Sequence, residues 1–333
     1  MKKGCFSFFL YYTVNPEQKT QEKTMTKRLF IFAGYDKDCI VDETLLHYLR
    51  SLSELGDIIF TMDNNLPDTE TTKVKAVKNM LSVTAVNHGE YDFGSYQRGF
   101  KYAQKNKLLN KYDWIYFVND SVYGPLFSIK NILEDLESRG ADLTGMTDFQ
   151  NKPTPLQVQS WFVGISQRVA NEEFLSNFMN NVTHEIAKQL IVLKYEVGLS
   201  QTILKHGYKM STFISGQDGE RSHDMYQQPI EMLKHGIPFV KKTALEALGG
   251  LQFLYPYTTV QIVDDIYKHA VRNKIPLTLA TENAKYKKCF RVTLFSIPFI
   301  TIHRQHANGS KHTSYKMYLL DKLPILKITT TEV

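Results

Sequence analysis

The sequence predicts an α/β fold in which a mostly parallel, Rossmann-like sheet is flanked by helices. Two observations support this fold class. From residue 28 to about residue 147, short apolar segments alternate with amphipathic segments that have helical spacing. Strands that alternate with helices in this way pair in parallel, because each crossover helix returns the chain to the same edge of the sheet.

The expected elements follow in order. RLFIFAG, residues 28–34, is a strand ended by a glycine, and Asp42 is placed to cap a helix that Gly56 stops. The next elements expected are a strand at 57–62, a helix at 74–81, a strand at 82–86, a helix from the turn at 88–94 to about Lys107, a strand at 113–120, a helix begun by Ser128 and a strand at 141–147. After residue 150 we expect strands at 157–166 and 208–214, with helices at 168–180, 183–194 and 196–206 between them.

Three regions divide the chain of 333 residues. Residues 1–26 are expected to form a poorly ordered leader: MKKGCFSFFLYY resembles a weak signal peptide without a cleavage site, and Met25 is an alternative start. The main domain is expected at 27–250, and a basic extension at 251–333. No apolar run reaches the length of about 20 residues that a membrane-spanning helix needs.

Charge and cysteine content narrow the possible partners and the compartment. The net charge of +6 suits nucleotide phosphates, nucleic acid or an anionic membrane. Nucleic acid is set aside, because the basic residues are not interleaved with aromatic ones along one core element. The cysteines, Cys5, Cys39 and Cys289, are odd in number and far apart, which favours the reducing cytoplasm.

Acidic residues stand where the first four predicted strands end: Asp36, Asp63, Asp92 and Asp120. Ligands of parallel α/β sheets bind beyond these carboxyl ends, so we expect the acids to converge on one crevice. Asp120 follows a long apolar run beside Asn119. It either holds a divalent cation that neutralises a diphosphate or caps the following helix.

Several segments together resemble the rhamnan synthesis F family. They are the start at KRLFIFAG, HGEYDFGSYQRGF (88–100), YDWIYFVNDSVYGPL (112–126), QSWFVGIS (159–166) and HGIPFVKK (235–242). The similarity covers about residues 27–245 in the right order. It implies a GT-A-like glycosyltransferase that uses a nucleotide-sugar donor, dTDP-rhamnose or a related one. The acceptor it implies is a growing or lipid-linked glycan of O-antigen, capsule or rhamnan at the inner face of the cytoplasmic membrane.

The same resemblance suggests how the donor is bound. Asp63 corresponds to the acid that contacts the base or ribose, with Tyr35 near it, and Asp120 to the last acid of a motif that holds Mg²⁺ or Mn²⁺. That motif reads Val-Asn-Asp here and lacks its first acid, so metal dependence is put in doubt. In the turn, Gly89 and Gly94 would let the backbone approach the donor, Asp92 would accept from a hydroxyl, and Arg98 would reach a phosphate. The alternative is a capped helix entry with Phe93 and Tyr96 in the core.

Five further candidates would serve the acceptor, the phosphate and the chemistry. An inverting transfer needs a base, and Glu196 is expected just before a helix in the place of the catalytic acid; the alternative is a helix-start Glu. Gln159, Ser160 and Trp161 would line the acceptor site, Trp161 by stacking on a sugar or else as part of the core. Lys241, with Lys242 beside it, would clamp phosphate or else be solvated.

The C-terminal segment 285–327 carries nine basic residues and one acid, Asp321. Its apolar runs at 292–302 and 318–328 are each about half of a membrane span. Such a segment suits an anionic membrane surface; the alternative is a pair of strands or helices that pack on the main domain. A second hypothesis for the whole chain is a carbohydrate-binding or assembly protein without catalytic activity.

Overall fold

The computed structural model describes residues 26–151, 154–215, 225–277, 290–294, 297–306, 312–319 and 323–331. The strands up to residue 241 are β1 Arg28–Gly34, β2 Asp57–Met62, β3 Met80–Ala85, β4 Trp114–Asn119, β5 Val122–Tyr123, β6 Leu143–Asn151, β7 Thr154–Val158, β8 Phe162–Ser166, β9 Met210–Ile214 and β10 Val240–Lys241. The α-helices are α1 Glu43–Ser53, α2 Asp68–Lys75, α3 Tyr91–Lys105, α4 Lys130–Ser138, α5 Gln167–Ala170, α6 Glu173–Asn180, α7 Lys188–Ile191, α8 Gly198–Lys205, α9 Pro229–Lys234 and α10 Val260–Arg272. Short 3₁₀ turns are η1 Leu109–Lys111, η3 Lys242–Ala244, η4 Glu246–Leu248 and η5 Leu251–Leu254, and η2 Val192–Val197 is a π-helical turn.

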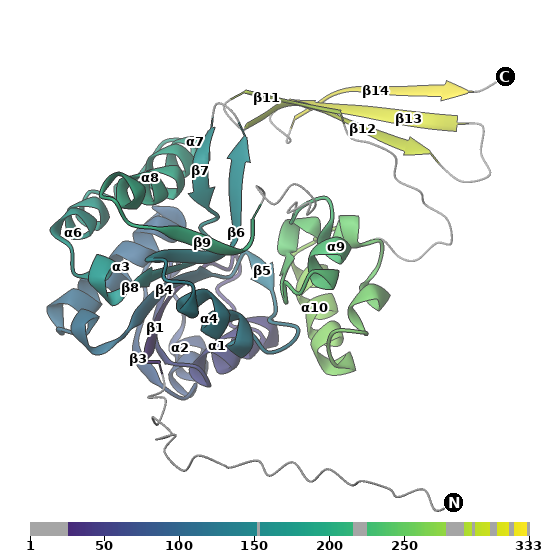
Figure 1. Cartoon of the computed structure of the whole chain (residues 1–333). Coiled ribbons are helices and arrows are strands. Elements are labelled where there is room, and N and C mark those ends of the chain that lie inside the picture. Colours follow the sequence, from purple (N-terminus) through teal and green to yellow (C-terminus); the bar gives the residue numbers. More distant parts are fainter. Residues whose placement is uncertain are drawn as a thin grey trace, which may run out of the picture.

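The central sheet has the strand order β3-β2-β1-β4-β8-β6-β7, with β9 paired to β6 (Figure 1). The pairs β3–β2, β2–β1 and β1–β4 are parallel, whereas β8 runs antiparallel between β4 and β6. The α/β fold class, with a mostly parallel sheet flanked by helices, is confirmed. Because β8 is antiparallel, its first residue Phe162 lies beside Val118, near the carboxyl end of β4.

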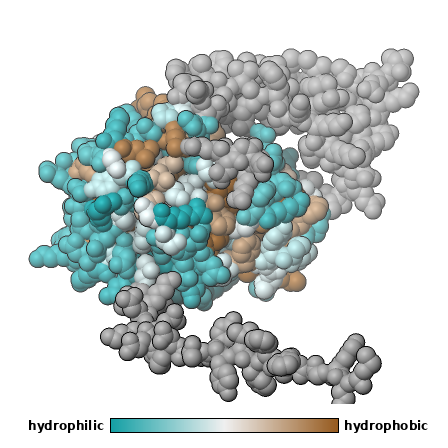
Figure 2. Space-filling view, viewed as in Figure 1, coloured by the Kyte–Doolittle hydropathy of each residue, from teal (hydrophilic) through white to brown (hydrophobic). Residues whose placement is uncertain are grey.

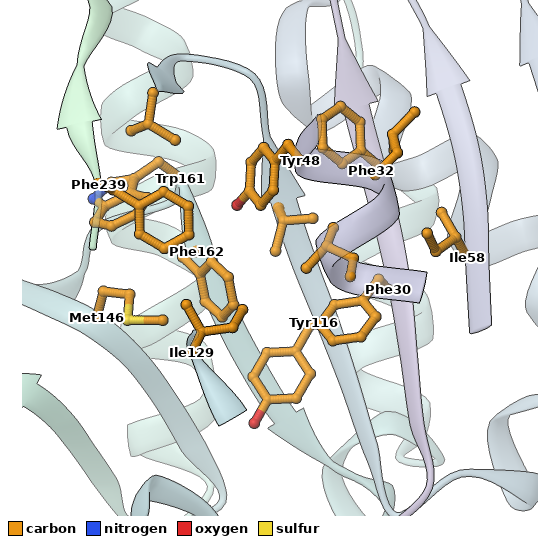
Figure 3. Packing of buried hydrophobic residues seen from close by; sticks show 14 of the residues in the cluster. Phe30, Phe32, Tyr48, Ile58, Tyr116, Ile129, Met146, Trp161, Phe162 and Phe239 are labelled. Atoms are coloured by element: carbon orange, nitrogen blue, oxygen red, sulfur yellow. The ribbon is translucent and has the colours of Figure 1, made fainter. Parts of the chain in front are cut away.

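Hydrophobic cores cover both faces of the sheet, and β1 shows how the sequence builds them. Phe30 and Phe32 belong to one core cluster, and Leu29 and Ile31 to the other, because successive side chains of a strand point to opposite faces. In the first cluster, Phe30 stacks on Tyr116 with ring centroids 5.3 Å apart (Figure 3). Helices cover both clusters, so the strands are apolar throughout.

A helical unit, residues 225–277, holds α9, the turns η3 to η5 and α10 (Figure 1). Its buried side chains, such as Leu233, Leu254 and Ile266, form a third cluster with Tyr123 and Leu126. In the view of Figure 2, hydrophilic residues cover most of the described surface, and hydrophobic residues reach it beside this unit. The domain boundary expected at residue 250 stays a prediction; this shared core leads us to propose that the main domain continues through residue 277.

Several local predictions were wrong. The strand expected at 157–166 is two strands, since β7 ends at Val158 and β8 begins at Phe162. The helix expected at 74–81 is instead α2, which follows Pro67, and Met80 already belongs to β3, which pairs with β2. The helix break expected near residue 195 is absent from the described chain, where α7, the π-turn η2 and α8 follow one another without a gap. Glu196 therefore does not follow a break in the chain; it lies inside a π-helical turn that leads directly into α8 at Gly198.

Beyond residue 289 the described segments are strands. β11 Phe290–Leu294, β12 Ile297–His306, β13 His312–Leu319 and β14 Leu323–Thr331 form an antiparallel sheet in that order. Parts of both apolar runs of the basic extension lie in these strands. In the described part of the chain, no helix is long and apolar enough to cross a bilayer. The predicted leader lies outside the described residues, except for residue 26.

Candidate active site

The carboxyl end of β4 is the centre of a polar network. Asn119 is buried there, and its Nδ2 donates to Asp92 Oδ2 at 2.7 Å, in the first turn of α3. Its Oδ1 accepts from the backbone N–H of Ser121 at 3.1 Å and from the Ser121 hydroxyl at 2.6 Å. One buried amide thus ties Asp92 to the segment that follows β4.

Asp120 lies between the end of β1 and a lysine. Its Oδ2 accepts from the backbone N–H of Tyr35 at 3.3 Å and is 3.5 Å from the Nζ of Lys242. The ring of Tyr35 is exposed. The strand-end acid therefore connects β1 with the lysine pair at the end of β10.

The lysine pair is fixed by the β5–β10 ladder. Lys241 pairs with Val122, and the backbone N–H of Lys242 donates to the Ser121 carbonyl at 3.0 Å. The Lys241 side chain is only 6% exposed, and its Nζ donates to Ser121 Oγ at 2.9 Å. This ammonium also lies 5.2 Å from the Trp161 ring centroid, within the range of cation–π attraction.

Glu196 approaches the same place from the π-turn. The hydroxyl of Ser160 donates to Glu196 Oε2, and Gln157 Nε2 donates to Oε1 at 3.4 Å. The phenol of Tyr96 donates to the Ser160 carbonyl at 3.0 Å. Burial raises the pKa of Tyr96, and the negative charges of Asp92 and Glu196 raise it further.

The turn at 88–94 is held by its own residues. Asp63 Oδ1 accepts from the backbone N–H groups of His88 at 2.6 Å and Gly89 at 3.0 Å. Arg98 pairs with Glu90, and a Cβ at Gly94 would lie 2.3 Å from Glu90 Cβ. Gly89 has a φ of +67°. In this structure Asp63 braces the turn, and glycine at 94 lets Glu90 fold back over the helix start.

The predicted residues therefore fall into two adjacent groups. Asp92 and Lys241 are joined through Asn119 and Ser121, and Asp120 lies beside Lys242. Ser160 and Glu196 join this group because the backbone N–H of Asn119 donates to the carbonyl of Trp161, next to Ser160. Asp63, Gly89, Gly94 and Arg98 form the braced turn beside it. Gln159 accepts from Thr147 and lies next to Ser160. The binding roles of these residues and of Tyr35 stay predictions.

Two expectations are corrected. Trp161 is 2% exposed and packs against Phe239 with ring centroids 5.3 Å apart, so it belongs to the core and offers no open face to a sugar (Figure 3). Asp36, the acid after β1, does not join the network: both its carboxylate oxygens accept from Arg272 in α10, at 2.9 and 2.6 Å. Sequence reasoning missed Arg272 and His269, which carry no local signal because their partners are more than 200 positions away.

A divalent cation at the end of β4, implied by the family resemblance, does not fit the residues there. Mg²⁺ and Mn²⁺ take about six oxygen ligands, usually with more than one carboxylate. Asp120 already faces Lys242, and the oxygen of Asn119 accepts two hydrogen bonds from Ser121. Among the residues described with side chains, no three acidic, histidine or cysteine residues are grouped to hold a metal.

Together, the fold and the network define an α/β protein with a group of polar side chains beyond the carboxyl ends of its central strands, a usual place for nucleotide sites. The chain matches the rhamnan synthesis protein F family over residues 58–277, and it belongs to that family. This membership supports a glycosyltransferase function in bacterial polysaccharide synthesis.

Individual relatives are more distant. Virulence protein VirA of Vibrio anguillarum is 23% identical over 256 residues, which cover 66% of this chain and 79% of VirA. Among solved structures, the apo form of the glycosyltransferase GlyE of Streptococcus pneumoniae TIGR4 gives a TM-score of 0.42 at 9% identity, over 78% of this chain and 67% of GlyE. The mannosyltransferase Ktr4p of S. cerevisiae gives 0.36 at 8% identity, over 56% and 68%. Scores of this size describe a partial likeness in the path of the chain and nothing about activity.

Proposed function

We propose that this protein transfers a deoxysugar, rhamnose in the first instance, from a nucleotide sugar to a glycan or lipid-linked glycan in bacterial cell-surface polysaccharide synthesis. The observation that carries the proposal is that a carboxylate and two ammonium groups, from different parts of the chain, all lie around the end of β4. Glu196 reaches this point through Ser160 and Tyr96, and Lys241 and Lys242 reach it through Ser121 and Asp120.

The proposed step is an inverting displacement. The acceptor hydroxyl gives its proton to Glu196 while its oxygen forms a bond to the anomeric carbon of the donor sugar. The bond between that carbon and the diphosphate oxygen breaks on the opposite face, and its electron pair leaves with the nucleoside diphosphate. Glu196 suits the base because its side chain is partly exposed and Ser160 orients it.

The remaining residues would position the two substrates. The backbone of the braced turn, with Gly89 and Gly94, lies beside Asp92 and would carry the nucleoside and the sugar. Ser160 and Gln159 in the turn before β8 would contact the acceptor, because this turn lies next to Asn119. These assignments follow from the shared position at the strand ends.

The test is the release of nucleoside diphosphate. The purified protein is incubated with dTDP-rhamnose, UDP-, GDP- and other dTDP-sugars, with and without a rhamnose-containing glycan acceptor. We expect release from one donor that depends on acceptor and is lost in Glu196→Gln. A protein that binds the glycan but releases no diphosphate from any donor would support the alternative, a carbohydrate-binding or assembly protein without catalytic activity.

A further inference from the structure

We propose that the positive charge at the donor diphosphate is supplied by Lys242, supported by Lys241, so that donor binding needs no divalent cation. This inference rests on the proposed function, because it concerns the charge that meets the leaving diphosphate. It follows from the disagreement between the metal motif that the family resemblance implies and the side chains that stand at the end of β4.

The first step is the ion pair of Lys242. Its Nζ is 3.5 Å from Asp120 Oδ2, longer than the 2.7–2.9 Å usual for a charge-assisted hydrogen bond. Other lysines of this chain pair tightly: Lys194 with Glu185 at 2.7 Å and Lys234 with Glu231 at 2.8 Å. The ammonium of Lys242 is therefore loosely held and has donors to offer to an anion.

The second step is its placement. Lys242 is 19% exposed at the side chain, and its backbone N–H is bonded to the Ser121 carbonyl, so its Cα is fixed beside the strand end. The Nζ lies 5.8 Å from the ring centroid of Tyr123, which guides the stem without neutralising the charge. The ammonium of Lys242, on a backbone that is held in place, thus lies beside Asp120, where the family motif would put a metal ion.

The third step is the role of Lys241. Its buried ammonium donates to Ser121 Oγ, and that hydroxyl donates to Asn119 Oδ1. The charge of Lys241 therefore orders the loop that bears Asp120, while Lys242 is the group that reaches the ligand. As the bond to the sugar breaks, negative charge grows on the leaving phosphate oxygen, and a preorganised ammonium there stabilises it.

The experiment measures nucleoside diphosphate binding by the full chain, by calorimetry with dTDP, UDP and GDP. Each titration is run in EDTA and again with Mg²⁺ or Mn²⁺. We expect the preferred nucleotide to bind in EDTA with a Kd within about threefold of that measured with metal, since an ammonium needs no added ion. Binding that disappears in EDTA and returns with metal would overturn the inference and leave the proposed function standing.

Variants of Lys242 distinguish the lysine ammonium from a metal ion as the cation that meets the diphosphate. Lys242→Met should raise the Kd about 10- to 100-fold, the loss of one charge-assisted hydrogen bond. Lys242→Arg should restore much of the affinity. The matched control is Lys234→Met, which removes an equally charged but exposed lysine of α9 and should leave the Kd unchanged. An unchanged Kd in Lys242→Met would overturn the inference.

Asp120→Asn should change the Kd of the nucleotide in opposite directions, depending on whether a lysine or a metal ion meets the diphosphate. Asparagine keeps an oxygen for the Tyr35 N–H and removes a negative charge next to the diphosphate. With a lysine as the cation, the Kd should fall or stay within about threefold. With a metal ion bound by Asp120, affinity should drop by at least about tenfold. If no nucleotide binds under any condition, both this inference and the proposed function are wrong.

Discussion

Glu196 owes its position to a single irregular turn. A π-turn holds one residue more than an α-helical turn. If residues 188–205 formed a regular α-helix, the residues after the turn would therefore be rotated by about 100° about the helix axis from their observed positions. The wider turn at Val192–Val197 instead points Glu196 to Ser160 while Tyr195 stays buried in the core. π-Turns inside α-helices are often found at functional sites. The residue was predicted from its surroundings in sequence, but the turn that orients it has no sequence signature.

At this residue we expect Glu196→Gln to lower turnover by about 10²–10⁴, because an amide cannot take the acceptor proton. Donor binding should stay near wild type, since the donor does not need the base. Glu173→Gln, on the exposed face of α6, serves as the control and should be fully active. Normal turnover with weakened donor binding would make Glu196 a binding residue instead.

Gly99 is a second residue whose identity is set by packing. A Cβ there would lie 2.3 Å from Ile31 Cγ2, so glycine allows α3 to lie close against β1. We expect Gly99→Ala to lower the free energy of unfolding by about 1–3 kcal/mol through overpacking, measured by denaturant titration. Gly198→Ala is the control: its Cβ would be 3.3 Å from a ring carbon of Phe178, and the change should cost less than about 1 kcal/mol. Equal effects in both variants would contradict this explanation.

At the scale of elements, α10 is fastened to the loop after β1. Arg272 bonds both oxygens of Asp36 and also reaches Asp42, which accepts from His269 at 2.6 Å. Burial alone would raise the pKa of Asp42, but the hydrogen bonds from His269, Thr44 and Arg272 hold it below its ordinary value of 3.8. The pKa of Asp36 is also lowered: burial opposes this, but the Arg272 guanidinium and the backbone N–H groups of Ile40 and Asp38 together outweigh burial.

Arg272→Met should destabilise the protein by about 3–5 kcal/mol, because it leaves the buried carboxylate of Asp36 and the half-buried carboxylate of Asp42 without their guanidinium. Since both acids have a lowered pKa in the folded chain, the unfolded chain binds more protons as the pH falls toward 4. The stabilisation is therefore complete above about pH 5 and declines progressively as the pH falls below about 4 toward the lower pKa values of the folded chain. The difference between wild type and variant in urea unfolding should shrink over that range.

Lys268→Met is the control for this prediction. It removes an exposed cation from the same helix, where Lys268 pairs with Asp264 at 2.7 Å. Exposed pairs of this kind contribute at most about 1 kcal/mol. A pH-independent loss of stability in Arg272→Met would show that packing of the arginine stem, and not its charge, holds α10.

The elements show where sequence reasoning succeeds. The strands β1, β2 and β4 were predicted to within one residue, because each is a continuous apolar run covered on both faces. The cap at Asp42 was also right: its side chain accepts from the Leu45 N–H. The helix at 74–81 failed because pairing with β2 draws Met80 into β3, a tertiary effect that local spacing does not contain.

The candidate site was predictable only in part. Position after a buried strand identified Asp120, and the expected convergence held for Asp92 through Asn119. It failed for Asp36, since the competing cation Arg272 comes from a helix far along the chain. Trp161 could not be assigned from sequence, because a tryptophan next to a strand serves a core or a sugar site equally well.

At the scale of the whole molecule, the antiparallel strand β8 assembles the site. It returns the chain so that Ser160 and Trp161 meet the end of β4, and the backbone N–H of Asn119 donates to the Trp161 carbonyl at 3.2 Å. The β5–β10 ladder brings the lysines to the same end. Asp120, Ser160 and Lys242 thus come from separate segments that this strand order places together.

The basic extension suggests contact with a membrane. We propose that the enzyme is cytoplasmic and binds peripherally to the inner face of the membrane, since each basic residue near an anionic surface contributes about 1 kcal/mol. We expect the full chain to sediment with vesicles containing phosphatidylserine or phosphatidylglycerol at low salt, and to be released at high salt. The triple change of Lys285, Lys287 and Lys288 to Glu should weaken sedimentation. A chain that stays in the supernatant at low salt would rule out this surface.

The bond between α10 and the loop after β1 also has a consequence during synthesis. Arg272 is separated from Asp36 by 236 positions, so at about 5–20 residues per second the ribosome delivers it roughly 12–47 s after its partner. Until then, Asp36 and Asp42 have no guanidinium partner, and burying their charges is unfavourable. We therefore expect the loop after β1, which lies beside Asp120, to stay unfolded. A chain that stops before residue 272 therefore leaves the carboxylates of Asp36 and Asp42, in the loop after β1, exposed to solvent.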